Sequence, residues 1–448
     1  LQPHDAIPDP LWSRGLGDVY KRQNLNKKQG ENMKIEKPES VGLSSERLKD
    51  FDKMLMEKYV GPEKLAGTQT LVARKGSIVH FHSQGKRDLE NNLPIDENTL
   101  FRIYSMTKPV TGVALMQLFE KGFFQLSDPV SKFLPEFNNQ QVYVSGSYPQ
   151  FMTEPVKRPM VVRDLLTHTS GLSYSINFRS HVDDAYRKIF KISDPTKALV
   201  SKEKVDLEEF TKRIASLPLE FSPGEQWLYS VSIDVCARLV EVISGKKIDQ
   251  YFEDHIFKPL KMEKTSFYVQ EKDLKDLAVC YHRDENKKIT IHDPGDTKSR
   301  YSAPRDFNGG GSGLISNAKE YYRFLQMLLN GGELEGERIL SRKTIELMTL
   351  NHLPDGQTMA DMGSSGSFSE VRYHGMGYGL SMAVTTDPAA SQSPLSKGSY
   401  NWGGMASTYF WIDPKEDLLA IFMTQFIPSD AFPLRPQMAT MVYGSFID

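Results

Sequence analysis

Segments that favour β-strands stand at both ends of this 448-residue chain, and segments that favour helices fill its middle. Near the N-terminus, residues 68–73 and 77–82 are rich in β-branched and aromatic side chains. Residues 378–384, 407–412 and 418–425, near the C-terminus, share that composition. Strands from opposite ends of a chain can form one sheet when the middle of the chain leaves the sheet and returns. We therefore predict an α+β fold, with an antiparallel sheet of about five main strands flanked by helices and a mostly helical region beside it.

The same arrangement sets the expected domain organisation. Residues 1–32 are polar, contain three prolines and show no hydrophobic period. They resemble translated adapter sequence from the ends of metagenomic reads, so we expect a non-native or disordered extension and a native start at Met33. The rest, residues 33–448, is expected to form one domain. Its α/β part and its helical part are expected to cover, respectively, about 33–122 with 301–448, and about 123–300.

Composition narrows the classes of partner. The chain has 55 basic and 57 acidic residues, a formal net charge of −2, which gives no reason to expect nucleic acid or an anionic membrane surface as a partner. No run of 18 apolar residues is present, so we expect no integral membrane segment. No signal peptide is visible, so we expect a cytoplasmic protein. Cys236 and Cys280 form neither a disulfide framework nor a metal-binding pair, so we predict no metal and no cofactor and leave the oligomeric state open.

A serine followed three residues later by a lysine is one way to activate a serine nucleophile. The G-x-S-x-G elbow is absent from the chain, which argues against an ordinary α/β-hydrolase. The Ser-x-x-Lys pattern occurs five times, with the serines at Ser83, Ser105, Ser201, Ser244 and Ser316. Four of these have structural interpretations as a turn, a polar surface, a helix end and a helix N-cap. Ser105 differs because it opens a long apolar helix, which we predict over residues 105–122.

The position of Ser105 at the start of an apolar helix suits a nucleophile. Residues i and i+3 share one face of a helix, so the amino group of Lys108 can reach the hydroxyl of Ser105. Burial disfavours the charged form of an amine and is expected to lower the pKa of Lys108. The helix N-terminus favours the negative charge that develops during attack. We therefore take Ser105 as the candidate nucleophile and Lys108 as its partner.

Three further segments follow in a specific order. Tyr229-Ser230-Val231 is a tyrosine motif, Trp402-Gly403-Gly404 precedes a predicted strand, and residues 163–172 read RDLLTHTSGL. Together with Ser105-Met106-Thr107-Lys108, they make the chain resemble the serine β-lactamase and penicillin-binding protein superfamily, and within it the β-lactamase-like (family VIII) carboxylesterases. The resemblance covers about residues 40–430. It implies the β-lactamase/transpeptidase-like form of the α+β fold.

The resemblance implies a role for each motif residue. Ser105 would attack the acyl carbonyl and carry the acyl-enzyme. Tyr229 would act as general base and then as general acid, which requires Lys108 to lower the pKa of the phenol from about 10. The oxyanion hole would be the backbone N–H groups of Ser105 and Met405, and each such donor is worth about 10²–10³ in rate. We expect His168, inside the RDLLTHTSGL segment, to be a buried, hydrogen-bonded histidine rather than a catalyst.

The third motif sets the expected substrate. Trp402, Gly403 and Gly404 are predicted to contact the substrate, and glycine lets the backbone approach it closely. True β-lactamases and penicillin-binding proteins carry lysine or histidine where this chain has Trp402, and class C β-lactamases carry asparagine where it has Val231. Both changes replace polar recognition by apolar surface. The expected partner is therefore a small-molecule ester with a neutral, hydrophobic acyl group rather than an anionic lactam.

The sequence thus predicts a serine hydrolase, namely a carboxylesterase that cleaves short-to-medium acyl esters through an acyl-enzyme on Ser105. Three alternatives stay open. One is a β-lactamase or D-alanyl-D-alanine carboxypeptidase, and another is an acyltransferase that uses the same residues. The third is a non-catalytic binding homologue that has kept the fold.

Overall fold

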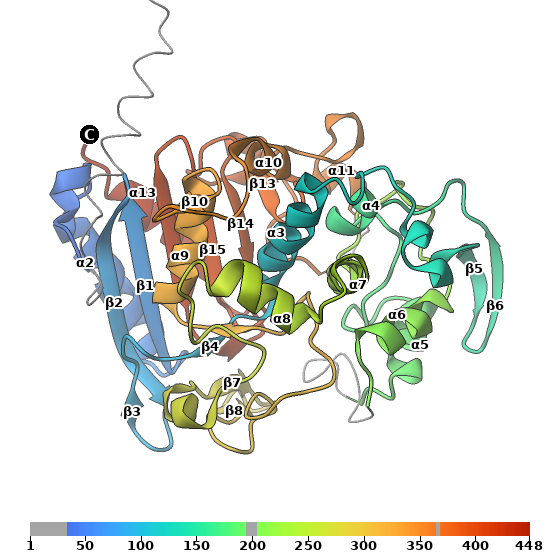
Figure 1. Ribbon diagram of the computed structural model, residues 1–448. Helices are drawn as coiled ribbons and strands as arrows, with labels where there is room; N and C mark the ends of the chain where they lie inside the picture. Colours follow the sequence, from blue (N-terminus) through green and yellow to red (C-terminus); the bar gives the residue numbers. More distant parts are fainter. Residues whose placement is uncertain (1–33, 194–203, 364–367) are drawn as a thin grey trace, which may run out of the picture.

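One antiparallel sheet organises the fold (Figure 1). The computed structural model describes residues 34–193, 204–363 and 368–448, so the extension expected over residues 1–32 lies outside the described residues. The strands of the main sheet are, in spatial order, β12 (Met376–Tyr378), β13 (Ala383–Thr385), β14 (Tyr400–Gly403), β15 (Tyr409–Asp413), β16 (Leu418–Met423), β1 (Gly67–Arg74), β2 (Ser77–Asp88) and β3 (Leu93–Pro94).

The sheet has eight strands, which corrects the expected number of about five. The strand predicted over residues 378–384 is two strands, β12 and β13, because Ser381 adopts a φ of +77° and turns the chain between them. β14 is a four-residue strand that had not been separated from the motif around Trp402. β3 is a two-residue edge strand, too short to be recognised by its pattern.

The two ends of the chain meet in the middle of this sheet. β1 lies between β2 and β16 and pairs with both in antiparallel fashion, from Gln69 opposite Met423 to Arg74 opposite Leu418. The β1–β2 turn contains Lys75, whose φ is +52°, followed by a glycine with a φ of +75°. The prediction that strands from both termini share one sheet is confirmed.

Helices cover both faces of the sheet (Figure 1). Because side chains alternate along a strand, Val72 and Phe422 join the core formed with α2 and α13, whereas Leu71 and Ile421 join the core formed with α3 and α9. The α-helices are α2 (Ser45–Leu55), α3 (Thr107–Glu120), α4 (Val162–Leu166), α5 (His181–Ile189), α6 (Leu207–Ala215), α7 (Ser232–Ser244), α8 (Ile248–Phe252), α9 (Ala318–Leu329), α10 (Arg342–Met348), α11 (Met359–Met362), α12 (Pro388–Ser391) and α13 (Leu434–Gly444).

The middle of the chain is less uniformly helical than expected. It contains α4 to α8 but also a hairpin, β5–β6, and the pair β7–β8, which extends through β17. The short strands outside the main sheet are β4 (Phe101–Arg102), β5 (Gln141–Ser147), β6 (Gln150–Pro155), β7 (Cys280–Arg283), β8 (Ile289–Asp293), β9 (Ile315–Ser316), β10 (Glu333–Leu334), β11 (Glu337–Arg338) and β17 (Phe426–Ile427).

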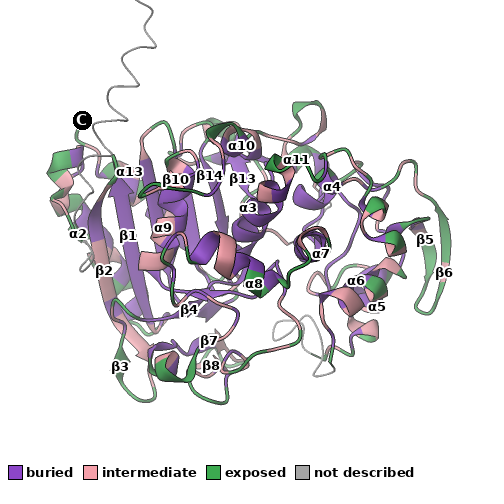
Figure 2. Cartoon of the chain, in the orientation of Figure 1, coloured by how far each residue is buried: buried purple, intermediate pink, exposed green. Residues whose placement is uncertain are grey.

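Helix α3 lies in the interior of the molecule. Figure 2 shows it as buried as the sheet itself, and nearly all its residues are enclosed, as its apolar sequence predicts. It packs against α7 from the helical part and faces the sheet with its other side. Across the described ranges, no helix is long and apolar enough to cross a membrane. Helix α3 therefore lies between α7 and the main sheet.

Candidate active site

Ser105 lies in a 3₁₀ turn, Tyr104–Met106, that leads directly into α3. β4 brings the chain to this turn and is held by pairing with β9. Tyr104 has a φ of +43°, which is uncommon for a residue other than glycine and turns the backbone sharply just before the serine. Lys108 is the second residue of α3, and residues three apart at the start of a helix share one face, so its side chain lies next to that of Ser105. Ser105 is 5% exposed, so its hydroxyl lies in a nearly closed site.

Lys108 is fully buried and donates two hydrogen bonds. One goes to the hydroxyl oxygen of Ser105 at 3.2 Å, and the other goes to the carbonyl oxygen of Gly311 at 2.7 Å. Burial lowers the pKa of Lys108 from 10.5 to about 8, while the charges of Asp234 and Glu370 oppose the shift. Lys108 is therefore an amine that loses its proton close to neutral pH.

Tyr229 reaches the same serine from the segment before α7. Its hydroxyl donates to the Ser105 oxygen at 2.7 Å, and the amine of Lys108 lies 4.5 Å from the centre of its ring. Burial raises the pKa of Tyr229 well above 10, Tyr174 and Glu370 add to the rise, and the hydrogen bond to Ser105 opposes it. The expected lowering of this pKa by Lys108 is not found. The reason is that Lys108, with a pKa of about 8, has already lost its charge at the pH where Tyr229 would ionise.

The β14–β15 turn lies beside the nucleophile. Gly404 in this turn passes close to the backbone just before Ser105. A Cβ atom at Gly404 would collide with the carbonyl oxygen of Ile103. Met405, the next residue, packs against the apolar group that contains Tyr104. Within the part of the chain that the structure describes, no hydrogen bond uses the N–H of Met405. The two predicted oxyanion donors, Met405 and Ser105, thus lie in neighbouring turns, and their role stays a prediction.

Trp402 lies behind Tyr229. It is fully buried, and its ring centre is 5.5 Å from that of Tyr229 and 5.3 Å from that of Tyr378. The indole thus packs against the back of the Tyr229 ring, and it presents no exposed surface for the substrate contact that we predicted. The next residue, Gly403, has no room for a side chain because a Cβ atom would collide with the guanidinium group of Arg435.

His168 is buried and hydrogen-bonded, as expected. Its Nδ1 lies 3.2 Å from the hydroxyl of Ser230. Its ring lies 5.9, 4.9 and 5.5 Å from those of Trp227, Tyr229 and Tyr378, respectively. Burial lowers the pKa of His168 well below 6.5, so the ring is neutral. It supports Tyr229 from the side, a role that the sequence did not reveal because it depends on packing between distant segments.

The glycine-rich loop 309–313 supports Lys108. Sequence reasoning did not predict this contact. The carbonyl of Gly311 accepts from Lys108, and its N–H donates to the Asp234 carboxylate at 2.9 Å. A Cβ atom at Gly309 or Gly311 would collide with Asp234, so close approach requires glycine here. Burial raises the pKa of Asp234 from 3.8 to about 6, and Lys108 opposes the rise. The clustered glycines were the available signal for this contact.

A buried ion pair stands under the β14–β15 turn. A guanidinium nitrogen of Arg435, on α13, is 2.5 Å from the Glu370 carboxylate and 3.5 Å from the carbonyl oxygen of Gly404. Ser429 donates to the same Glu370 oxygen at 3.0 Å. Nothing in the local sequence indicated this pair, because its members come together through the tertiary fold.

Metal binding has no evident site in the described ranges. No group of three or more His, Cys, Asp or Glu side chains there is placed to hold a metal ion. Cys236 and Cys280 are both free and buried, and a free cysteine in such a place packs as a small hydrophobic residue.

Fold and site together define the class. A serine contacted by a lysine three residues later and by a tyrosine from another segment, at the start of a buried helix beside an antiparallel sheet, is the architecture of a β-lactamase-like serine hydrolase. The sequence model of the family named Beta-lactamase matches residues 53–439. The chain belongs to the beta-lactamase family, as its motifs predicted.

Known relatives cover most of the chain. Esterase EstB from Burkholderia gladioli is 30% identical over 84% of this chain and 88% of its own length. Acyltransferase calJ from Penicillium decumbens is 28% identical over 75% of this chain and 78% of its own. Among solved structures, EstCE1, described as a hydrolase with promiscuous acyltransferase activity, matches with a TM-score of 0.73 at 23% identity, covering 91% of this chain and 99% of its own. The β-lactamase/transpeptidase-like fold is thereby confirmed.

Proposed function

We propose that this protein is a serine carboxylesterase that cleaves short-to-medium acyl esters through an acyl-enzyme on Ser105. The observation that carries the proposal is the pair of hydrogen bonds from Lys108 and Tyr229 to the Ser105 hydroxyl in a buried site. The similarity to esterase EstB supports the choice of an ester as substrate.

Acylation begins when Lys108 is neutral. The proton of the Ser105 hydroxyl moves to the Lys108 nitrogen, and the serine oxygen forms a bond to the acyl carbon. The N–H groups of Ser105 and Met405 hold the oxyanion that forms at the carbonyl oxygen. The bond between the acyl carbon and the alcohol oxygen then breaks. The alcohol takes its proton from Tyr229, which recovers one from Lys108.

Deacylation repeats these steps with water as the nucleophile. Water loses a proton to neutral Lys108 while its oxygen attacks the acyl carbon. The bond to Ser105 breaks, and the serine oxygen takes a proton from Tyr229, which again recovers one from Lys108. The products are the carboxylic acid and the resting enzyme, so protons and bonds balance over the cycle.

The residues around the reacting group favour an apolar acyl chain. Trp402 stands where β-lactamases and penicillin-binding proteins carry a cation, and Val231 stands where class C β-lactamases carry asparagine. Without that cation, the carboxylate next to a lactam ring loses its partner. We therefore expect nitrocefin to be a poor substrate compared with p-nitrophenyl esters.

Acyl transfer is the second candidate, because the relative calJ is named an acyltransferase. An alcohol that replaces water in deacylation would give transfer with the same residues. Product analysis separates the two outcomes. We would incubate the enzyme with p-nitrophenyl butyrate and a primary alcohol and measure butyrate against the new butyrate ester by chromatography.

The test of the main proposal uses p-nitrophenyl acetate, butyrate and octanoate, with nitrocefin alongside. Wild type, Ser105→Ala and Ser244→Ala would be compared, since Ser244 belongs to another Ser-x-x-Lys pattern at the end of α7. We expect short-ester turnover to fall at least about 10³-fold in Ser105→Ala and to be unchanged in Ser244→Ala. Turnover that survives in Ser105→Ala would refute the nucleophile. Fast nitrocefin cleavage would favour a β-lactamase, and failure to react with a fluorophosphonate would favour a binding homologue.

A further inference from the structure

The β14–β15 turn is joined to the turn that carries Ser105 through one backbone carbonyl, that of Ile103. The Ile103 oxygen accepts from the N–H of Met106 at 3.0 Å, inside the serine turn. It also accepts at 3.4 Å from the hydroxyl of Thr408, the last residue before β15. Gly404 passes close to the same oxygen. A direct chain of contacts therefore links the β14–β15 turn to the nucleophile.

Two donors hold the carbonyl end of the peptide unit that joins Gly404 to Met405. The N–H of Ser407 donates to the Gly404 oxygen at 3.0 Å, and a terminal nitrogen of Arg435 lies 3.5 Å from the same oxygen. This peptide bond is trans, so its N–H points in the direction opposite to its C=O. The N–H of Met405, the predicted oxyanion donor, is therefore aimed away from both donors, and no acceptor among the described residues takes it.

Arg435 lies against the backbone on both sides of this turn. It belongs to the first turn of α13, and its guanidinium group approaches Gly403 so closely that a Cβ atom there would collide with it. The guanidinium carbon lies 5.3 Å from the centre of the Tyr409 ring. The group thus touches the last residue of β14 and the first residue of β15. It is placed to fix the turn that joins the two strands.

Glu370 in turn fixes the guanidinium group. The nitrogen that faces Gly404 lies 2.5 Å from a carboxylate oxygen of Glu370, and another terminal nitrogen donates to the Glu370 backbone carbonyl. Ser429 donates to that carboxylate oxygen at 3.0 Å. The Glu370 side chain is completely buried, so solvent screens its attraction to Arg435 only weakly. The guanidinium group is therefore held in one orientation against the turn.

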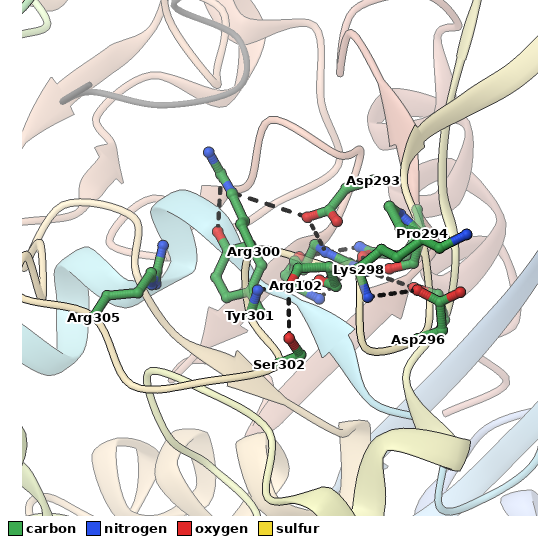
Figure 3. Close-up of polar contacts among 12 residues, drawn as sticks. Arg102, Asp293, Pro294, Asp296, Lys298, Arg300, Tyr301, Ser302 and Arg305 are labelled. Carbon is green, nitrogen blue, oxygen red and sulfur yellow. Dashed lines mark hydrogen bonds and ion pairs between the residues drawn. The ribbon is translucent and has the colours of Figure 1, made fainter. Parts of the chain in front are cut away.

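Two other arginines, both buried, hold segments outside the site. Arg102 donates through its Nε to Asp293 at 3.1 Å (Figure 3). Arg74 donates to the carboxylate of Asp448 and to the carbonyl of Val41, both at 2.9 Å. Within the described ranges, neither arginine has a hydrogen bond to the β14–β15 turn. The guanidinium group on α13 differs from both, because it lies against a peptide unit of the candidate site.

We propose that Arg435 is a positioning residue for the oxyanion hole. Held by Glu370, it fixes the carbonyl end of the Gly404–Met405 peptide and so aims and strengthens the N–H donor at the other end. The inference rests on the proposed acyl-enzyme function. A hydrogen bond to the oxygen of a peptide polarises the whole unit and makes its N–H a stronger donor. This gain is largest when the acceptor carries a full negative charge, as the acyl oxygen does after Ser105 attacks.

The test compares a ketone that forms an oxyanion at the site with one that does not. In hexyl trifluoromethyl ketone, the fluorines activate the carbonyl. The oxygen of Ser105 can then add to the carbonyl carbon while its proton moves to Lys108, and the carbonyl oxygen becomes an oxyanion. Hexyl methyl ketone has the same chain but resists this addition. Each would be measured as an inhibitor of p-nitrophenyl butyrate cleavage.

The inhibition would be measured at about pH 9.5, above the pKa of Lys108 of about 8, so that a change in this pKa contributes little. Wild type, Arg435→Lys, Arg435→Gln and Glu370→Gln would be compared. Lysine keeps the charge but lacks the planar fork that serves a carboxylate and a carbonyl together. Arg74→Lys and Arg74→Gln are the matched controls, because Arg74 is a buried arginine with a carboxylate partner and an aromatic contact outside the site. If Arg435→Gln does not fold, Arg435→Lys and Glu370→Gln give the same comparison.

The readout is the inhibition constant of the methyl ketone divided by that of the trifluoromethyl ketone, which does not depend on the fraction of folded enzyme. We expect this ratio to fall about 10- to 100-fold in Arg435→Gln, since a misaimed donor costs less than a missing one. It should fall less in Arg435→Lys and Glu370→Gln and stay unchanged in both Arg74 variants. For p-nitrophenyl butyrate, kcat/KM should fall by the same factor, while the inhibition constant of the methyl ketone stays unchanged. A merely structural role would lower the amount of active enzyme and leave the ratio as in wild type.

Two failures are distinguishable. If wild type cleaves the ester and the ratio in the Arg435 variants equals that in the Arg74 variants, the positioning role is refuted and the esterase proposal stands. If wild type cleaves no ester, the esterase proposal fails, and direct binding of the two ketones, measured by thermal shift, replaces inhibition. A preference for the trifluoromethyl ketone that Arg435→Gln removes and Arg74→Gln keeps would still support the positioning role. No preference in wild type would overturn it.

Discussion

Replacing Asp234 by asparagine is expected to lower the pH at which Lys108 loses its proton, and with it the pH at which the enzyme becomes active. The Asp234 carboxylate accepts from the N–H of Gly311 at 2.9 Å, and the carbonyl of the same residue accepts from Lys108 at 2.7 Å. Asparagine keeps an oxygen at the accepting position, so the loop keeps its geometry. Only the negative charge disappears. A negative charge stabilises the ammonium form and raises its pKa, so its removal lowers the pKa.

The two hydrogen bonds of Gly311 set the size of the expected shift in the pKa of Lys108. With one peptide residue between them, the charges of Lys108 and Asp234 stand roughly 7 Å apart. At an effective dielectric constant of about 20, their interaction is about 2.4 kcal/mol, an upper value of about 1.7 pKa units. We expect a shift of about one unit, from a pKa of about 8. At pH 7 the neutral fraction of Lys108 would then rise about fivefold.

The assay is kcat/KM for p-nitrophenyl butyrate between about pH 6 and pH 10. In wild type, kcat/KM should rise with pH through the pKa of Lys108 at about 8, and in Asp234→Asn the same rise should come about one unit earlier. Asp249→Asn, on the exposed side of α8, removes the same charge far from the amine and should leave the profile unchanged. A profile that stays in place or moves to higher pH in Asp234→Asn would show that the rise does not report Lys108.

Two further substitutions test the other parts of the site. Tyr229→Phe keeps the ring in its packing but removes the donor to Ser105, so kcat should fall about 10²–10⁴-fold with little change in melting temperature; a loss below tenfold would count against the phenol as proton donor. Gly404→Ala would push the β14–β15 turn away from Ile103, so kcat should fall about 10²–10³-fold and the protein should lose stability. Gly444→Ala, where nothing lies within 4 Å, is the control, and full activity in Gly404→Ala would exclude this turn from the oxyanion hole.

The parts of the fold that could be predicted are those with a local signal. The β1–β2 hairpin has two strand patterns around a turn, and α3 has a long apolar run, so each is recognisable without the rest of the molecule. β3 and β14 were missed because strands of two and four residues exist only through pairing with their neighbours. The split of β12 from β13 depends on the positive φ of Ser381, which no strand propensity encodes.

In the candidate site, too, contacts between residues close in sequence could be predicted, and contacts between distant segments could not. Ser105 and Lys108 are three residues apart at the start of a long apolar helix, and the spacing together with that helix predicts their contact. The contacts of Asp234 with the glycine-rich loop and of His168 with the Tyr229 ring join segments far apart in the chain. Their partners cannot be assigned before the fold is known.

Burial also separates two groups that the sequence leaves nearly equal. A free phenol and a free lysine amine lose their protons at similar pH, near 10. Burial disfavours whichever form is charged, so it raises the pKa of Tyr229 and lowers that of Lys108 to about 8. While Lys108 is charged, both groups donate to the Ser105 oxygen, and the serine proton has no acceptor in either of them. Once Lys108 is neutral, it can accept that proton while Tyr229 keeps its own for the leaving alcohol. In the proposed mechanism, the same desolvation that closes the site thus suits the amine to act as the base and the phenol to act as the acid.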